Sequence, residues 1–223
     1  MSTTPTDRAV LVVDVGGTSV KFLATGQTDY REAPSGGEMD AEIMVRTVKG
    51  LAGDWHYDMV TLGYPGRVRK GRPAAEPKNL KSGWVVFDFE TAFSCPVRII
   101  NDAAMQALGS YDGGRMLFLG LGTGVGSTLI VDNHIVPLSL GDMAFKRGTF
   151  DYYLNREAFK RLGPTRWQRH VIKAGLLLKD AFEADYVVLG GGKADRLEKL
   201  PDGLRRGDNR NAFLGGFRLW EKD

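Results

Sequence analysis

Short apolar runs with a strand-like character alternate with stretches of helical periodicity along this chain. The strand-like runs cover residues 9–15, 19–25, 57–63, 97–102, 115–122, 127–133, 134–139 and 185–192. Helical spacing is clearest after Pro164, which suits a first helical turn, and the apolar positions that recur there are Trp167, Val171, Ala174, Leu178 and Phe182. Further helices are predicted over residues 41–51, 102–110 and 211–219. This alternation predicts an α/β fold.

Glycine-rich turns follow two of the predicted strands, once after "LVVD" and once after "MLFLGL". Each turn is followed by another strand-like run, so each half of the chain begins with a predicted β-hairpin. The repetition predicts two related lobes whose hairpin turns face a shared cleft. We expect one lobe to comprise residues 1–112 with a C-terminal helix at 207–223, and the other to comprise residues 113–206.

Composition narrows the class of protein. Of the 223 residues, 26% are charged and 43% are hydrophobic, which is typical of a globular protein. No apolar run is long enough for a membrane span, and the first residues lack the pattern of a secretory signal, so a cytoplasmic location and no membrane partner are expected. The net charge of +3 gives no case for nucleic acid. Cys95 is the only cysteine, which excludes an internal disulfide and a multi-cysteine structural zinc site.

The first glycine turn, "DVGGTSVK", has the composition of an anion-binding loop. Gly16 and Gly17 leave backbone N–H groups accessible to an oxyanion, and Thr18 adds a hydroxyl donor. Asp14 ends a buried strand and suits a Mg²⁺ ion or its waters, while Lys21 has the charge to neutralise phosphate. A plain hairpin with a Gly-Gly turn is the alternative.

The second turn, "GLGTGVGS", predicts a second phosphate-binding hairpin formed by Gly122, Thr123 and Gly124. It does not match a dinucleotide fingerprint, because a strand-like run follows it in place of a helix. A third cluster, Gly190, Gly191 and Gly192, follows a strand and is predicted to open a helix. Such a helix N-terminus would accept a phosphate or allow a base and ribose to pack closely.

Together these three turns resemble the sugar kinases of the ROK family, within the actin-like ATPase superfamily, and the polyphosphate glucokinases are the most similar in character. The resemblance covers nearly the whole chain in order. It implies a two-lobed actin-like ATPase (ribonuclease H-like) fold, a phosphate-1 motif at the first turn, a phosphate-2 motif at the second and an adenosine motif at "VVLGGG". It further implies Mg²⁺, ATP or polyphosphate as phosphoryl donor, a sugar as acceptor, and a homodimer.

A carboxylate that accepts the proton of a sugar hydroxyl is needed for this chemistry. The resemblance assigns that role to Asp102 in "RIINDAAMQALG", although Asp102 is also a good N-cap for the helix that follows. The resemblance places further sugar-contacting residues at Gly63, Pro65 and Gly66 in "LGYPGRV", at Asn79 beside Trp84 in "EPKNLKSGW", and at Asn101.

One segment departs from the family pattern. Where the family has Glu and His in E-x-G-H, this chain has Ser139 and Asp142, and Asp151 replaces a Glu further on. Buried sugar hydroxyls left without partners cost about 1 to 3 kcal/mol each, so the preference for glucose is open. The alternatives to a glucokinase are a kinase for another sugar or polyol, and a sugar or nucleotide sensor of the same fold without activity.

Overall fold

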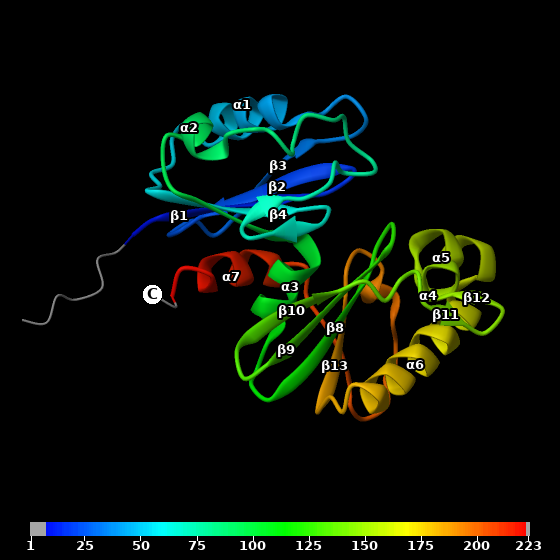
Figure 1. Cartoon of the computed structure of the whole chain (residues 1–223). Coiled ribbons are helices and arrows are strands. Elements are labelled where there is room, and N and C mark those ends of the chain that lie inside the picture. Colours follow the sequence, from blue (N-terminus) through cyan, green and yellow to red (C-terminus); the bar gives the residue numbers. More distant parts are fainter. Residues whose placement is uncertain (1–7, 222–223) are drawn as a thin grey trace, which may run out of the picture. The chain divides into compact units, whose positions relative to one another are not determined.

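The computed structural model describes residues 8–221 and divides them into two compact units (Figure 1). Unit 1 comprises the described residues up to Asp102 and those from Gly216 onward, and unit 2 comprises Ala103–Gly215. These boundaries lie inside two helices, whereas the sequence places the divisions at residues 112 and 206. Within residues 8–221, no helix has both the length and the apolar character needed to cross a membrane.

Unit 1 is built on a five-stranded sheet in the order β3-β2-β1-β4-β7. Its strands are β1 (Val10–Val15), β2 (Ser19–Ala24), β3 (Arg31–Pro34), β4 (Met59–Tyr64) and β7 (Val97–Asn101). β1 and β2 form an antiparallel hairpin, while β1, β4 and β7 run parallel. A small ribbon of β5 (Val68–Arg69) and β6 (Arg72–Pro73) follows β4. The parallel strands direct their carboxyl ends to one edge of the sheet.

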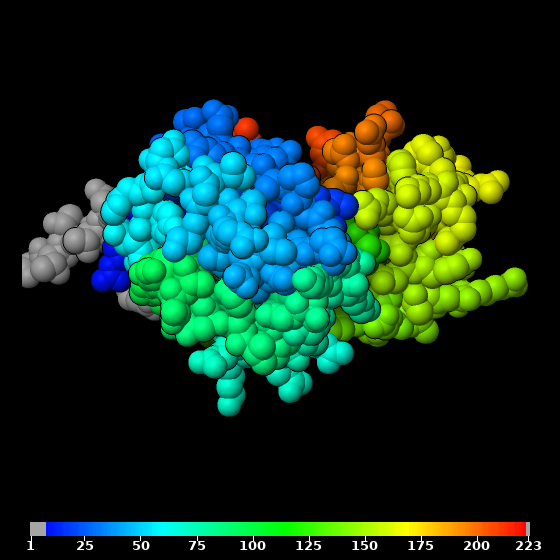
Figure 2. Space-filling model, turned by 90° about the horizontal axis from the view of Figure 1, so that it is seen from above, coloured from blue at the N-terminus to red at the C-terminus, as the bar shows by residue number. Residues whose placement is uncertain are grey.

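One face of this sheet is covered by α1 (Ala41–Leu51) and α2 (Phe89–Phe93), and Figure 2 looks onto that helical face. α1 begins at Asp40, whose carboxylate accepts the Ile43 amide, and it buries Met44 and Val48 against the core. The first lobe therefore has an apolar core of its own, which includes β1, β4 and Trp84.

Unit 2 contains a second five-stranded sheet, in the order β10-β9-β8-β13-β14. The strands are β8 (Arg115–Leu121), β9 (Val125–Val131), β10 (His134–Leu138), β13 (Tyr186–Gly190) and β14 (Leu204–Arg206). β8 and β9 form an antiparallel hairpin, and β8, β13 and β14 run parallel. Each unit thus contains one of the predicted hairpins, and in each the first hairpin strand also pairs with a parallel strand.

The helices of unit 2 gather largely in the segment between β10 and β13. They are α4 (Phe150–Leu154), α5 (Arg156–Leu162) and α6 (Pro164–Ala181), preceded by the hairpin of β11 (Ala144–Phe145) and β12 (Gly148–Thr149). The stripe predicted after Pro164 is confirmed from Trp167 to Leu178, which are buried, whereas Phe182 is the C-cap residue. The predicted helices at 102–110 and 211–219 are α3 (Asp102–Ser110) and α7 (Asn211–Arg218).

A close crossing of α3 and α7 explains two glycines in unit 2. A Cβ atom on Gly109 would lie 1.8 Å from the Asn211 carbonyl oxygen, and one on Gly215 would lie 1.8 Å from that of Met105. Any larger side chain would force these backbones apart. Glycine at these two positions therefore allows the two helices to approach to backbone contact distance.

Candidate active site

Polar groups gather at the carboxyl ends of the parallel strands in unit 1. In the sheet register Asp14 on β1 lies beside Gly63 on β4, and Asn101 on β7 lies beside Tyr64. Asp102 follows directly as the first residue of α3. Ligands of open α/β sheets bind at this edge. The structure therefore brings Asp14, Gly63, Asn101 and Asp102, which the sequence separates by up to 88 positions (102 − 14), to one side of unit 1.

The carboxyl group of Asp14 is electrostatically unusual. Its burial, and to a smaller extent the negative charge of Asp102, raise its pKa to about 7, while the Lys21 ammonium acts in the opposite direction. Lys21 lies directly across the hairpin from Asp14 and also faces Glu32 at 3.9 Å. The charge of Lys21 does not cancel the rise in pKa that burial causes. The site therefore favours either an additional cation or a proton on Asp14.

Asn101 joins the candidate base to the turn of "LGYPGRV". Its side-chain Nδ2 donates to Asp102 Oδ1 at 2.9 Å and to the Gly66 carbonyl oxygen at 3.0 Å. Gly66 is required there, because a Cβ atom would lie 2.8 Å from the Tyr64 ring. Pro65 is partly exposed between them and Gly63 is buried. The observed contacts of Asn101 therefore position Asp102 and the turn, whatever else its side chain binds.

The first glycine turn combines internal bonds with open donors. The Gly16 amide donates to the Ser19 carbonyl at 3.0 Å, and the Ser35 hydroxyl donates to the Gly16 carbonyl at 2.6 Å. Within residues 8–221 the amides of Gly17 and Thr18 have no protein acceptor. A Cβ atom on Gly17 would lie 3.4 Å from Asn79 Cβ, so the predicted phosphate turn and the predicted sugar residue are neighbours.

A carboxylate that the sequence analysis did not single out orders the loop of Asn79. Glu76 accepts the amides of Gly83, Trp84 and Val85, at 3.0 to 3.3 Å. Trp84 is fully buried and its indole N–H donates to the Lys81 carbonyl. Trp84 therefore belongs to the core of unit 1, whereas Asn79 of the same loop is exposed. No periodicity marks Glu76, because its partners are backbone amides.

The second glycine turn is the three-residue loop between β8 and β9. Gly120 pairs with Gly126, which leaves Gly122, Thr123 and Gly124 at the tip. In the described part of the chain the three tip amides have no protein acceptor, and a Cβ atom on Gly122 would meet nothing closer than 3.7 Å. The protein's own packing does not demand glycine at residue 122, so the open backbone suits an approaching anion.

Two side chains from the following helices hold this turn. Asp151 Oδ1 accepts the Val125 amide, and the Asp151 amide donates to the Gly141 carbonyl at 2.9 Å. The Arg156 amide donates to the Gly122 carbonyl at 2.8 Å, and its Nη2 donates to Thr123 Oγ1 at 3.1 Å. Asp151, which the resemblance places among the sugar residues, thus contacts the phosphate-2 turn. Arg156 was missed, because only the tertiary fold brings it to Thr123.

The third glycine cluster ends β13 beside β8, where Gly190 pairs with Gly120. A Cβ atom on Gly190 would lie 2.5 Å from the Phe118 ring, and Gly191 has a φ of +82° with the Leu121 amide nitrogen 2.8 Å from its Cβ position. These two glycines serve packing. Gly192 is exposed and has open space around it, so it alone leaves room for a ligand.

The helix predicted after this cluster is wrong. Only the short 3₁₀ helix η1 (Ala194–Arg196) forms, because Leu197 adopts an extended conformation with a ψ of 123° and buries its side chain. A three-residue turn has no macrodipole of useful size, so the interpretation of a helix N-terminus that accepts phosphate is withdrawn. The segment can still contribute its exposed backbone.

The segment that departs from the family pattern lies after β10. Ser139 and Asp142 are both exposed, whereas Leu140 between them is buried and its amide donates to Ser127 Oγ at 3.1 Å. Leu140 anchors the segment to β9 and leaves the two polar residues at the surface of unit 2.

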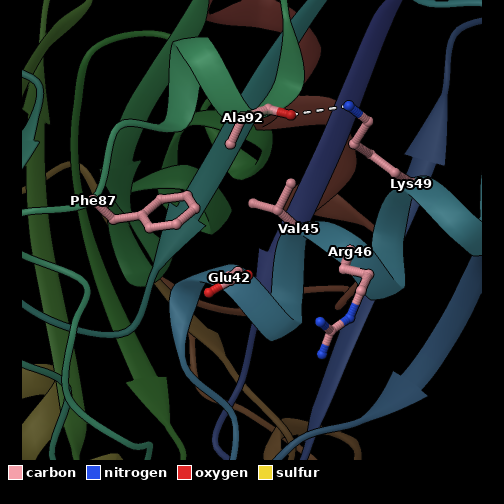
Figure 3. A pocket seen from close by; sticks show the side chains of 6 residues that line it. All are labelled: Glu42, Val45, Arg46, Lys49, Phe87 and Ala92. Carbon is pink, nitrogen blue, oxygen red and sulfur yellow. Dashed lines mark hydrogen bonds between the residues drawn. The ribbon is translucent and has the colours of Figure 1, made fainter.

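The described residues outside these turns and strand ends offer little for a metal ion or a polar ligand. Among the described residues no group of three or more His, Cys, Asp or Glu side chains converges on a common point. A shallow groove of about 330 Å³ lies between α1 and the segment that leads into α2, where the Lys49 ammonium donates to the Ala92 carbonyl at 2.9 Å (Figure 3). None of the candidate residues lines this groove, which is mostly apolar.

Comparison with known proteins identifies the class. The model of the ROK family matches residues 10–141, which is more than half of the chain, so the chain belongs to the ROK family. This confirms the predicted family of sugar kinases and, with it, phosphotransferases as the class of enzyme. No curated protein matches the sequence.

Solved structures agree on the fold. The inorganic polyphosphate/ATP-glucomannokinase from Arthrobacter sp. strain KM is similar with a TM-score of 0.77 and 21% identity over 96% of this chain and 98% of that one. A ROK family glucokinase from Streptomyces griseus, solved with glucose and AMPPNP, gives 0.78 and 15% over 96% and 100%. A putative N-acetylmannosamine kinase from Listeria monocytogenes gives 0.76 and 18% over 96% and 100%. These likenesses confirm the actin-like ATPase fold.

Proposed function

We propose that this ROK family protein is an active kinase that transfers a phosphoryl group from ATP or polyphosphate to a hydroxyl of a glucose-like sugar. The observation that carries the proposal is the coupled pair of Asp14 and Asp102 at the strand ends of unit 1. A carboxyl group whose pKa is raised by burial and by a neighbouring carboxylate is typical of a catalytic site. The amides of the turn at residues 122–124 support a donor site in unit 2.

In this proposal Asp102 is the general base. Its carboxylate accepts the proton of the sugar hydroxyl, whose oxygen forms a bond to the terminal phosphorus of the donor as the bond to the leaving phosphate breaks. Asn101 holds the carboxylate by donating to Oδ1. Asn79 and the turn of Gly63, Pro65 and Gly66 are proposed to contact the sugar.

Mg²⁺ fits the residues that are present. The Asp14 carboxyl, whose raised pKa reflects burial without sufficient positive charge, would hold the ion or its waters. Mg²⁺ would neutralise charge on the donor phosphates. We expect Mg²⁺ to raise the unfolding temperature of the protein more at pH 8, where Asp14 is ionised, than at pH 5, and Asp14→Asn to abolish that difference. A pH-independent rise would contradict this assignment.

The function is tested with purified protein, Mg²⁺ and a panel of sugars, with ATP and with polyphosphate as donors. We expect at least one pairing to give a sugar phosphate, and Asp102→Asn to lower kcat by about 10²- to 10⁴-fold with binding of sugar and donor retained. The proposal fails if no donor and sugar pair turns over.

The exposed residues Ser139 and Asp142 favour a second candidate function, an inactive sugar or nucleotide sensor. A sensor needs no base, so its ligand affinity and its response would survive Asp102→Asn. Binding of a sugar without turnover, by both the parent protein and this variant, would decide for the sensor. Turnover of a sugar or polyol other than glucose would instead indicate that the segment of Ser139 and Asp142 determines which acceptor is used. A homodimer and a cytoplasmic location stay predictions from the sequence.

A further inference from the structure

Two cations of unit 2 lie at the edge of the sheet from which the turn at residues 122–124 projects, Arg156 on Thr123 and Lys193 after the third glycine cluster. We propose that Arg156 and Lys193 bind the linked phosphates of the donor that are not transferred. The inference rests on the proposed function for its biological meaning, but it concerns a binding site in unit 2 that is measurable without any sugar. Neither residue belongs to the glycine turns from which the sequence analysis predicted the donor site.

Arg156 is fixed to the phosphate-2 turn at two points. Its amide bonds to the Gly122 carbonyl at 2.8 Å and its guanidinium bonds to Thr123 Oγ1 at 3.1 Å. The Asn155 side chain accepts the Ala158 amide and so defines the start of α5, which sets the position of Arg156. A guanidinium with five donors uses one on Thr123, so the others are available to phosphate oxygens.

Lys193 reaches the same helix from the third glycine cluster. Its ammonium lies 5.1 Å from the centre of the Phe159 ring, and Phe159 is one helical turn beyond Arg156 on α5. Gly191, two residues before Lys193, packs on the backbone of Leu121 at the end of β8. The segment of Lys193 and the turn at residues 122–124 therefore leave the sheet of unit 2 at the same edge, because Gly190 pairs with Gly120.

Neither cation is neutralised by a carboxylate within the described residues 8–221. The nearest acidic residues in sequence pair elsewhere, Glu157 with Lys160 at 3.0 Å and Asp195 with Arg196 at 3.4 Å. Asp151 also approaches the turn, but its Oδ1 accepts the Val125 amide. Arg156 beside the three open amides, and Lys193 at the same edge of the sheet, would together offer an anion more positive charge than one phosphate group requires.

A chain of linked phosphates matches this arrangement. Each phosphate carries negative charge and several acceptor oxygens, and Arg156 with its planar fork would bind one while Lys193 binds the next. Both the triphosphate of ATP and inorganic polyphosphate have this chemistry. The two sources differ in the adenosine, which only ATP carries and for which the exposed Gly192 leaves room.

Binding is measured by calorimetry with inorganic tripolyphosphate and, separately, with a non-hydrolysable ATP analogue, both with Mg²⁺ and without sugar. We expect Arg156→Gln to weaken tripolyphosphate binding about tenfold or more, and Lys193→Gln about three- to tenfold. Lys160→Gln removes a charge from the same helix whose partner is Glu157, and we expect affinity within about twofold of the parent protein. Sugar affinity should not change in any of the three variants.

The two donor arms separate the sources. Equal losses for tripolyphosphate and the ATP analogue assign Arg156 and Lys193 to phosphates common to both donors, and a loss confined to one names the donor class. Parent-like binding of both ligands by Arg156→Gln and Lys193→Gln overturns the proposal, as does an equal loss in Lys160→Gln or no binding by the parent protein. If Arg156→Gln lowers the unfolding temperature, the result for Lys193→Gln decides, because Lys193 contacts the Phe159 ring and holds no turn in place.

Failure here and failure of the proposed function are distinguishable. Binding of tripolyphosphate that depends on Arg156 and Lys193, in a protein that phosphorylates no sugar, supports this inference and rejects the kinase. Turnover with a donor KM that is unchanged in both variants rejects this inference and keeps the kinase. In an active protein we expect the substitutions to raise the donor KM and leave the sugar KM as it is.

Discussion

The two units place different chemistry at the same edge of similar sheets. In unit 1 the parallel strand ends carry Asp14 and Asp102, whose side chains interact with each other and with groups of the protein. In unit 2 the corresponding edge carries open amides at residues 122–124 and the cations Arg156 and Lys193. The same arrangement of a hairpin and parallel strands thus carries carboxylates in unit 1 and groups that suit an anion in unit 2.

The glycines show the same contrast. Gly16 and Gly66 are explained by atoms of unit 1 that fill the space of a Cβ atom, namely the Ser19 carbonyl oxygen at 2.9 Å and the Tyr64 ring at 2.8 Å. Gly122 and Gly192 in unit 2 have open space in front of them. A glycine that packing does not require points to a ligand more strongly than a glycine that packing explains. By this criterion unit 2 is the better candidate for direct backbone contact with phosphate.

The largest effect is expected at the carboxylate site. The carboxyl of Asp14 keeps its proton up to about pH 7 in the folded protein, whereas its ordinary pKa is 3.8. The folded state therefore loses stability relative to the unfolded chain as the pH rises through this window. Asp14→Asn cannot ionise, so its free energy of unfolding should exceed that of the parent protein by about 2 to 4 kcal/mol more at pH 8 than at pH 4.

Urea unfolding of both proteins between pH 4 and pH 8 measures this difference. The same substitution should lower phosphoryl transfer about a hundredfold or more, because the proposed metal ligand is lost. A variant that is more stable and less active would mark Asp14 as a functional residue. Parallel pH dependence of the two proteins would show that Asp14 does not carry the raised pKa.

The second prediction separates a packing glycine from an open one. Gly190→Ala would place a methyl group 2.5 Å from the Phe118 ring and 3.2 Å from Gln106 Oε1, so we expect a loss of about 1 to 3 kcal/mol in the free energy of unfolding. Gly192→Ala meets nothing and should change stability by less than about 0.5 kcal/mol. Thermal unfolding of the pair measures both, and equal effects would contradict the division of the cluster.

The sequence predicts those elements that depend on local or periodic patterns, and fails where an element depends on tertiary contacts. The stripe from Trp167 to Leu178 was predicted because burial repeats with the helical period. The glycine turns and the family were predicted because they are local patterns. The helix after Gly192 was predicted wrongly, because local signals did not reveal that Leu197 is extended and buried in the core of unit 2.

The site residues show the same limit. Asp14 and Asp102 lie at the ends of predicted strands. Because the carboxyl ends of parallel strands meet at one edge of a sheet, the sequence alone predicts that they lie close together. Arg156 donates to the side chain of Thr123, 33 residues earlier, and Glu76 accepts backbone amides 7 to 9 residues further on, and no spacing along the chain predicts those contacts. The role of Arg156 depends on which segments lie side by side, and that of Glu76 on how its own loop folds, and neither is a repeating pattern.

A third, smaller effect is expected where Asp151 supports the anion site. Asp151→Ala leaves the Val125 amide without its acceptor, and we expect a loss of about 1 to 2 kcal/mol in the free energy of unfolding and a higher donor KM. Asp151→Asn retains an acceptor oxygen and should lose less than half of that. If the sugar KM rises in both variants while the donor KM is unchanged, Asp151 contacts the sugar as the family resemblance implies.

The smallest change in stability is expected for Gly122→Ala, which tests whether the turn at residues 122–124 binds the donor. A methyl group on Gly122 has room in the protein, with the nearest other atom 3.7 Å away, so the free energy of unfolding should change by less than about 0.5 kcal/mol. The methyl group would occupy space that a phosphate needs, so we expect the donor KM to rise about five- to tenfold with the sugar KM unchanged. Gly120→Ala is the matched control on β8, because Phe118 lies 3.4 Å from its Cβ position and its cost should be in stability. Unchanged donor KM in a folded Gly122→Ala protein would remove the turn from the donor site and leave the contrast between the two units to Arg156 and Lys193 alone.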